Sequence, residues 1–221
     1  MKLLINAILK FTVGLLLVSA LLFLPAGSFG YINAWIFIGL LFIPMLILGT
    51  VLYIKSPGLL EKRLDVKEKE NTQKGVVALS GLLFIGGFVV AGLDYRFSWS
   101  SVPTPVVIVA SVILLVSYAL YAELMRENAY LSRTIEVQEN QKVVDTGLYG
   151  IVRHPMYAVT IWLFLSIPVV LGSWWSLLCF APYVPIIFVR ILNEEKVLES
   201  GLDGYAEYKK KVKYRILPFI W

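Results

Sequence analysis

Six long apolar runs constrain the fold of this chain more than any other feature of its sequence. A helix needs roughly 20 predominantly apolar residues to cross the hydrocarbon core of a bilayer, with a range of about 17 to 25. Three of the runs reach this length unaided, and the first can be extended by the apolar residues that precede it. The runs cover residues 11–24, 32–54, 76–93, 106–124, 157–171 and 174–191. The sequence therefore predicts an all-α integral membrane protein with about six transmembrane helices.

The basic residues divide the connecting segments into two classes. The chain holds 20 Lys and Arg and has a formal net charge of +5. Most of these residues lie at the N-terminus, in segments 55–74 and 125–155, and from residue 190 onward, whereas the three alternate loops contain Arg96 alone. Because short cytoplasmic loops collect Lys and Arg, this pattern predicts that both termini are cytoplasmic. The same placement accounts for the positive charge without a nucleic-acid partner.

We expect two regions along the chain. Residues 1–124 form four membrane helices with a charged inner loop at 55–74, and residues 125–221 form a polar loop (125–155), a helical hairpin (156–192) and a cytoplasmic tail (193–221). Alternating charges predict a solvated helix in the inner loop. The polar loop is longer than a simple connection requires, so we expect it to be functional. Residues 134–137 and 142–144 could be short extended pieces, and the tail is expected to be helical with a break at 201–204.

The N-terminus admits a second interpretation. Lys2 and Lys10, an apolar stretch and then Ala26-Gly27-Ser28 are also typical of a secretory signal with a small-residue cleavage site. Removal of this segment would leave five spans. The two long polar loops would remain cytoplasmic in either case.

The inventory of reactive side chains excludes several classes of chemistry. The chain has a single His and a single Cys, and its apolar runs hold no paired carboxylates at metal spacing, so we expect no zinc or di-iron site. It contains neither a G-x-x-x-x-G-K-[ST] phosphate loop nor a G-x-G-x-x-G after a predicted strand. The lone Cys179 also rules out a disulfide framework.

Polar side chains gather at the two inner ends of the predicted hairpin. A charged group at the centre of a bilayer costs about 3 kcal/mol or more, so these residues are expected at the membrane surface, where the ends of a hairpin meet. The candidates are Gln141, Gly147, Tyr149, Arg153, His154 and Tyr157 on one side, and Arg190, Glu194, Glu195, Tyr205 and Tyr208 on the other. Singly, each has a simpler interpretation; Arg190, for example, can pair with Glu194 one turn away. Their coincidence favours a shared pocket.

A family resemblance follows from these residues. Positions 141–157, read as Q-K-V-V-D-T-G-L-Y-G-I-V-R-H-P-M-Y, resemble the signature of isoprenylcysteine carboxyl methyltransferase-like membrane proteins. The resemblance continues in the same order through Glu194-Glu195, Gly204-Tyr205-x-x-Tyr208 and Leu217-Pro218, and thus covers about residues 128–218. Phospholipid N-methyltransferases are similar more loosely. One departure is Val159, preceded by Ala158, where the family often has a small residue such as Gly.

The resemblance implies an S-adenosyl-L-methionine-dependent methyltransferase with a cytoplasmic cofactor-binding loop. Such enzymes methylate a lipophilic or lipid-linked acceptor that reaches them through the bilayer. The implied cofactor-binding residues are Gln141, Gly147, Tyr149, Arg153, His154, Tyr157 and Glu194, and the implied catalytic residues, facing the acceptor, are Arg190 and Glu195. The acceptor stays open: an isoprenylcysteine carboxylate, another lipid, a small thiol or an amine. The oligomeric state is equally open.

Two other functions are left open by the sequence. Sterol reductases share a related C-terminal architecture and bind NADPH, although they have more spans. A non-catalytic transporter or assembly protein is the second alternative. Against transport, no ionisable residue lies near the middle of an apolar run. The exclusion is partial, because Pro44, Pro168, Pro182 and Pro185 interrupt the runs.

Overall fold

The chain folds into a bundle of helices. The computed structural model describes residues 2–65, 71–131 and 137–221, and within these ranges it contains helices and loops but no strand. The elements are α1 (Lys2–Ala26), α2 (Ile32–Lys55), α3 (Pro57–Leu64), α4 (Asn71–Phe97), α5 (Thr104–Glu127), the 3-10 helix η1 (Gly147–Gly150), α6 (Pro155–Val170), α7 (Trp174–Phe180), α8 (Tyr183–Gly201) and α9 (Tyr205–Lys211). The predicted all-α fold is confirmed.

Five helical stretches in the described part of the chain are long and apolar enough to cross a membrane. They are α1, α2, residues Gln73–Phe97 of α4, α5, and the stretch Trp174–Gly201 that comprises α7 and α8. The apolar helix α6 has 16 residues, fewer than the roughly 20 that a span needs. The prediction of about six spans is roughly confirmed, with α6 as the short one, and the protein is a multi-pass membrane protein.

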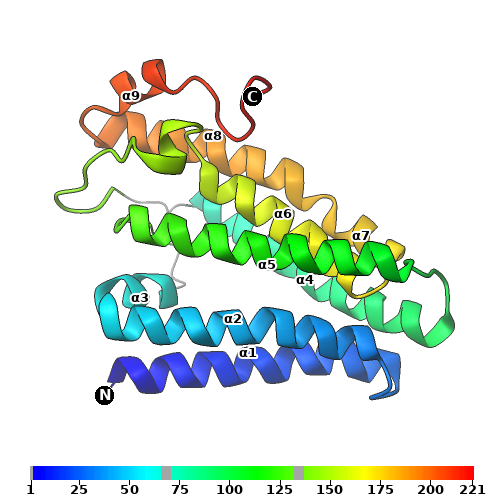
Figure 1. Ribbon diagram of the computed structural model, residues 1–221. Coiled ribbons are helices and arrows are strands. Elements are labelled where there is room, and N and C mark those ends of the chain that lie inside the picture. Colours follow the sequence, from blue (N-terminus) through cyan, green and yellow to red (C-terminus); the bar gives the residue numbers. More distant parts are fainter. Residues whose placement is uncertain (1, 66–70, 132–136) are drawn as a thin grey trace.

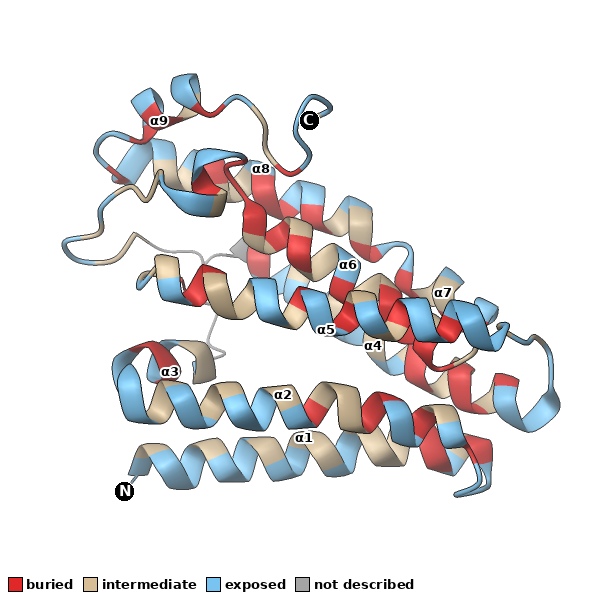
Figure 2. Ribbon diagram, viewed as in Figure 1, coloured by how far each residue is buried: buried red, intermediate tan, exposed pale blue. Residues whose placement is uncertain are grey.

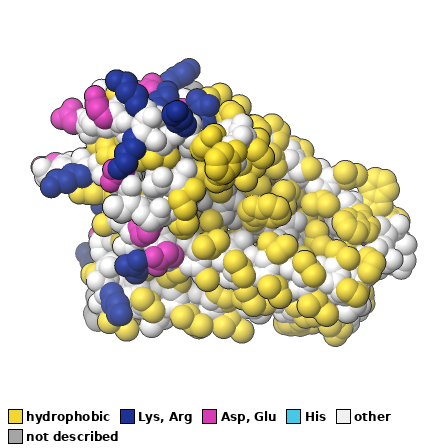
Figure 3. All heavy atoms as spheres, turned by 45° about the horizontal axis from the view of Figure 1, so that its top comes forward, with side chains coloured by type: hydrophobic (Ala, Val, Ile, Leu, Met, Phe, Trp, Pro, Cys, Tyr) yellow, Lys and Arg dark blue, Asp and Glu magenta, His cyan; other side chains and the backbone are white. Residues whose placement is uncertain are grey.

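The long helices lie side by side, so the connecting segments fall at two ends of the molecule (Figure 1). One end carries the N-terminus, α3, η1 and α9, and the other carries the turns that join α1 to α2 and α4 to α5. Charged side chains gather over the first end, whereas hydrophobic side chains cover much of the remaining visible face (Figure 3). We call the charged end the inner end and the opposite one the outer end.

The main core cluster lies toward the outer end, where buried residues of α1, α2, α4, α5, α6 and α7 pack together (Figure 2). Phe84 of α4 contacts Phe164, Phe180 and Tyr183 edge to face, with ring centroids 4.7, 5.0 and 6.0 Å apart. Gly87 permits this approach, because a Cβ at that position would lie 2.2 Å from the ring of Phe180. Large apolar side chains on α1, α2 and α5 stay exposed, as expected for helices that face lipid.

A buried carboxylate holds the outer ends of the helices together. Asp94, near the end of α4, is 1% exposed and accepts hydrogen bonds from the backbone N–H and the hydroxyl of Ser100, both at 2.6 Å. It also accepts from the hydroxyl of Ser173, which in turn caps the start of α7. The preceding Gly172 has a φ of +80°, a conformation that glycine adopts without steric cost. The turn of the predicted hairpin is therefore anchored to α4.

Three local predictions are revised. The inner loop 55–74 does not form one solvated helix, because α3 ends at Leu64 and α4 begins at Asn71, while residues 66–70 lie outside the described part. Of the proposed extended pieces, residues 142–144 form a loop, and 134–136 are outside the described residues. The second arm of the hairpin breaks at Pro182 into α7 and α8. The predicted break in the tail is confirmed between α8 and α9.

Candidate active site

The inner ends of α6 and α8 meet, as the predicted hairpin requires. Pro155 occupies the first position of α6, where the missing N–H of proline breaks no helical hydrogen bond. The motif residues Arg153 and His154 therefore lie directly before the helix. Their backbone N–H groups donate to the carbonyls of Tyr214 and Arg215, at 2.9 and 2.8 Å. The C-terminal segment thus fixes the backbone of the motif.

Glu195 of α8 lies at the centre of a buried cluster of charges. Its Oε1 atom is 2.8 Å from Arg153 Nε and 3.3 Å from His154 Nε2, and its Oε2 atom accepts from Arg215 Nε at 3.0 Å. Glu195, Arg153 and His154 are all buried. The Arg153 guanidinium also donates to the carbonyls of Val212 and Lys213, at 2.7 and 2.8 Å. This network joins α6, α8 and the C-terminal segment.

A second series of hydrogen bonds runs from Gln73 of α4 to Glu194 of α8. The side chain of Arg190 donates from Nε to the Tyr157 hydroxyl and from Nη1 to Gln73 Oε1, both at 2.9 Å. The Tyr157 hydroxyl in turn donates to Glu194 Oε2 at 2.5 Å. Tyr157, Arg190 and Gln73 are buried. These bonds hold the Arg190 cation and the Glu194 carboxylate in fixed relative positions at the inner end of the helices.

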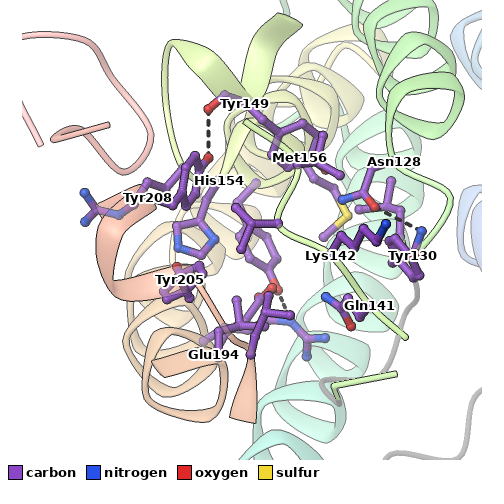
Figure 4. Close-up of a pocket in the computed structure, with 18 residues that line it drawn as sticks. Asn128, Tyr130, Gln141, Lys142, Tyr149, His154, Met156, Glu194, Tyr205 and Tyr208 are labelled. Carbon is purple, nitrogen blue, oxygen red and sulfur yellow. Dashed lines mark hydrogen bonds between the residues drawn. The ribbon is translucent and has the colours of Figure 1, made fainter. Parts of the chain in front are cut away.

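A cavity of about 100 Å³ lies between these groups, walled by the loop after α5, η1, the start of α6, the end of α8, and α9 (Figure 4). The predicted site residues that line it are Gln141, Tyr149, Arg153, His154, Tyr157, Arg190 and Glu194. The α9 residues Tyr205 and Tyr208 line it as well, and the Tyr208 hydroxyl donates to the Tyr149 carbonyl at 2.7 Å. The structure thus brings together residues as far apart in the sequence as Asn128 and Tyr208.

Two predicted site residues are not among the described residues that line the cavity. Glu195 lies behind Arg153 and His154, so its place suits support of these two side chains rather than contact with an acceptor. Gly147 has a φ of +53°, and a Cβ there would lie 1.6 Å from Glu127 Oε1. The same Glu127 accepts from the backbone N–H of Leu148 at 3.2 Å. Gly147 therefore shapes η1 through its backbone.

Two buried hydroxyls in the cavity wall are available to a ligand. The hydroxyls of Tyr149 and Tyr205 have no hydrogen-bond partner among the described residues. Burial, and then the nearby charges of Glu195 and Glu194, raise the pKa of Tyr205 well above its ordinary value. This hydroxyl therefore stays protonated and can donate. Since buried polar groups are normally paired, a polar ligand would complete the site.

Several residues of the site were not among the sequence-based candidates. Gln73 is far from the motif in sequence and reaches Arg190 from α4. Arg215 is one of several basic residues in the tail, and it is distinguished by its hydrogen bond to Glu195. Asn128, Tyr130 and Lys142 line the cavity from the loop. These three residues lie in a polar loop that is longer than a simple connection requires. That excess length is a sequence signal that could have identified them.

The fold and the site define an integral membrane protein with a polar cavity at the inner end of its helices. Residues 104–202 match the model of the phospholipid methyltransferase family. The match runs from α5 to the residue after α8, and it includes most of the cavity lining. It confirms the resemblance to membrane methyltransferases seen in the motif.

The chain is also similar to a reductase. It is 27% identical to a delta(14)-sterol reductase of Mus musculus, over 40% of this chain and 22% of the reductase. The similar region thus spans about a fifth of the length of that relative. This match and the family match both concern less than half of the present chain.

Proposed function

We propose that this protein transfers a methyl group from S-adenosyl-L-methionine to a lipophilic acceptor at the cytoplasmic face of a membrane. The observation that carries the proposal is the polar cavity at the inner end, where residues of the methyltransferase-like motif converge. The family match covers the same part of the chain. The apolar helices beneath the cavity favour an acceptor that partitions into the bilayer.

The cavity offers partners for each end of this cofactor. The Glu194 carboxylate suits its amino group or ribose hydroxyls, and the neutral Tyr149 and Tyr205 hydroxyls suit its carboxylate. Aromatic faces such as that of Tyr157 attract cations, which suits a sulfonium. When bound, the cofactor supplies a methyl group on a positively charged sulfur. We assign Gln141 to the loop that covers it.

Cofactor binding requires the cavity to widen. Its volume of about 100 Å³ is well below the roughly 300–1,000 Å³ of typical small-molecule sites. The wall formed by residues 137–146 has no helix or strand within it and is held by a few side-chain bonds. One example is the hydrogen bond that Gln138 Nε2 donates to the Tyr130 carbonyl, at 2.6 Å. We therefore propose that this wall moves outward when the cofactor binds.

Arg190 is the group we assign to the acceptor side of the chemistry. Methyl transfer by in-line displacement depends on alignment of donor and acceptor. Arg190, held by Gln73 and Tyr157, would orient a carboxylate or phosphate. We assign Glu195, together with Arg153 and His154, to positioning the cavity wall.

Thermal unfolding of the detergent-purified protein tests the proposal. A ligand that binds the folded state stabilises it by about 2.7 kcal/mol at 100 times its dissociation constant. S-adenosylhomocysteine should therefore raise the unfolding temperature in a concentration-dependent manner. The absence of any shift at millimolar concentration, together with no methyl transfer from labelled S-adenosylmethionine to host lipids, would contradict the proposal.

A reductase is the second candidate, because the chain is similar to part of a delta(14)-sterol reductase. In that case NADPH, rather than S-adenosylhomocysteine, should stabilise the protein in the same experiment. The family match favours the methyltransferase. A response to NADPH alone would reverse this order.

A further inference from the structure

A second cavity lies in the lipid-facing side of the molecule, between α5 and α6. Its volume of about 380 Å³ is within the range of typical small-molecule sites and exceeds that of the polar cavity. We call it the α5–α6 groove. It is lined by Val112, Ile113, Val116, Ser117 and Leu120 of α5, by Leu148, Ile151 and Val152, by Pro155, Ala158, Val159 and Trp162 of α6, and by Ile216 and Pro218. Apart from Ser117, these residues are apolar.

The groove opens toward the bilayer. Val112, Val116, Ile151 and Trp162 line it and are each more than half exposed. From Val112 to Leu120 it follows α5 for roughly 12 Å at 1.5 Å per residue. It therefore extends from the inner end into the hydrocarbon region. A groove of this shape and lining suits a hydrocarbon chain that enters sideways from the membrane.

The same segment of chain separates the groove from the polar cavity. Leu148, Val152 and Pro155 line the groove, whereas their neighbours Tyr149, Arg153 and Met156 line the cavity. The backbone of residues 148–156 thus forms part of the wall between the groove and the polar cavity. Its inner edge is η1, which α9 contacts through the hydrogen bond from the Tyr208 hydroxyl to the Tyr149 carbonyl. A lipid with its tail in the groove would have its polar head at the level of the cavity.

The C-terminal segment places the groove at the membrane surface. Ile216 and Pro218 line the groove, next to the backbone bonds that join Tyr214 and Arg215 to the residues before α6. The neighbouring Leu217, Phe219 and Ile220 are exposed and apolar. Exposed apolar side chains beside basic residues such as Lys213 are typical of segments that lie at a lipid interface. The inner end of the groove therefore coincides with the headgroup layer.

We propose that the α5–α6 groove binds the hydrocarbon chain of the lipid acceptor and so selects acceptors by their chain. The identity of the ligand as a methyl acceptor rests on the proposed methyltransferase function. The binding of a hydrocarbon chain in the groove does not. Ala158 and Val159, where the sequence departs from the methyltransferase-like motif, line this groove.

Photocrosslinking in nanodiscs tests the binding of a chain. The probe is a phosphatidylcholine with a diazirine in its acyl chain. Peptides that contain residues 112–120 and 151–162 should be labelled several-fold more than equally exposed residues of α1. Val116→Trp, and independently Val112→Trp, should abolish this excess. Val109→Trp is the matched control, because Val109 lies on the same helix, is 58% exposed and does not line the groove.

Methyl transfer from labelled S-adenosylmethionine to chloroform-extractable host lipids tests the identity of the ligand. Val116→Trp should raise the half-saturating mole fraction of host lipid extract roughly tenfold, the effect of losing about two buried methylenes, with an unchanged affinity for S-adenosylhomocysteine. In the crosslinking experiment, labelling of each peptide in proportion to the exposure of its residues would overturn the proposal. So would loss of labelling in Val116→Trp with unchanged methyl transfer. If wild-type protein binds no S-adenosylhomocysteine, the proposed function fails, and the crosslinking still decides whether the groove holds a chain.

Discussion

At the scale of single residues, Glu194 and Glu195 are neighbours with different surroundings. The Glu194 carboxylate lines the polar cavity and accepts from Tyr157. The Glu195 carboxylate is 3% exposed and is surrounded by Arg153, His154 and Arg215. One helix turns these two side chains to different sides, because successive residues point about 100° apart. A matched pair of substitutions can therefore separate binding from stability.

Glu195→Gln should destabilise the protein, whereas Glu194→Gln should weaken cofactor binding. Loss of one partner from a buried ion pair costs about 3–5 kcal/mol, or roughly 6–12 °C of unfolding temperature at the lower end of that range. For Glu194→Gln we expect about a tenfold weaker affinity for S-adenosylhomocysteine and a nearly unchanged unfolding temperature. Calorimetry and thermal unfolding check both. The reverse pattern would assign the two carboxylates the opposite roles.

Arg190→Ala should abolish turnover more than it weakens cofactor binding. The side chain is fixed by Tyr157 and Gln73, and we assign it to the acceptor. Gln73→Leu should act in the same direction but less, by about 10- to 100-fold in kcat, since hydrogen bonds to charged groups contribute about 1.5–3 kcal/mol. Single-turnover kinetics and ligand titration distinguish the two effects. Equal losses of turnover and cofactor affinity would refute this division.

At the scale of elements, the short helix η1 is shaped by its contact with the end of α5. Gly147 adopts a positive φ and leaves no room for a side chain beside Glu127. Glu127 in turn binds the N–H of Leu148. The position of η1 matters because residues on its two sides line the polar cavity and the groove. We therefore expect η1 to be sensitive to the smallest change at Gly147.

Gly147→Ala should lower both the unfolding temperature and the affinity for S-adenosylhomocysteine. The added Cβ meets Glu127 Oε1, and a non-glycine residue in the left-handed region costs about 1–2 kcal/mol. The double variant Gly147→Ala/Glu127→Ala removes the clash but not the backbone strain. It should therefore recover part of the loss. A double variant no more stable than Gly147→Ala would show that the contact with Glu127 is unimportant.

At the scale of the whole molecule, the two regions expected from the sequence, 1–124 and 125–221, contribute to one site. Gln73 of α4 reaches Arg190 of α8, so the N-terminal region supports the candidate active site directly. At the outer end, Asp94 holds α4 against the start of α7 through Ser173. We propose that the inner end, with its charged side chains, faces the cytoplasm.

Cysteine labelling tests this orientation, because the chain has a single native cysteine, Cys179. In a Cys179→Ser background, Ser101→Cys at the outer end should react with a membrane-impermeant maleimide in intact cells. Glu139→Cys, in the loop at the inner end, should react only after permeabilisation. Labelling of Glu139→Cys in intact cells would contradict cytoplasmic placement of the site.

Composition and local pattern were sufficient to predict the helical membrane fold, the two ends of the bundle and about half of the cavity lining. These properties depend on short-range features: apolar runs of a given length, the placement of Lys and Arg, and a motif held within one loop and one hairpin. The apolar pattern did not reveal the break at Pro182, because an apolar run does not show where a helix within it ends.

The tertiary structure alone decided which polar groups meet. It placed Glu195 behind Arg153 and His154, brought Gln73 and Arg215 to the site, and set Gly147 against Glu127. It also formed the α5–α6 groove from residues of α5, α6 and the C-terminal segment. These contacts join positions tens of residues apart, and their formation depends on how the helices pack, which no local pattern encodes.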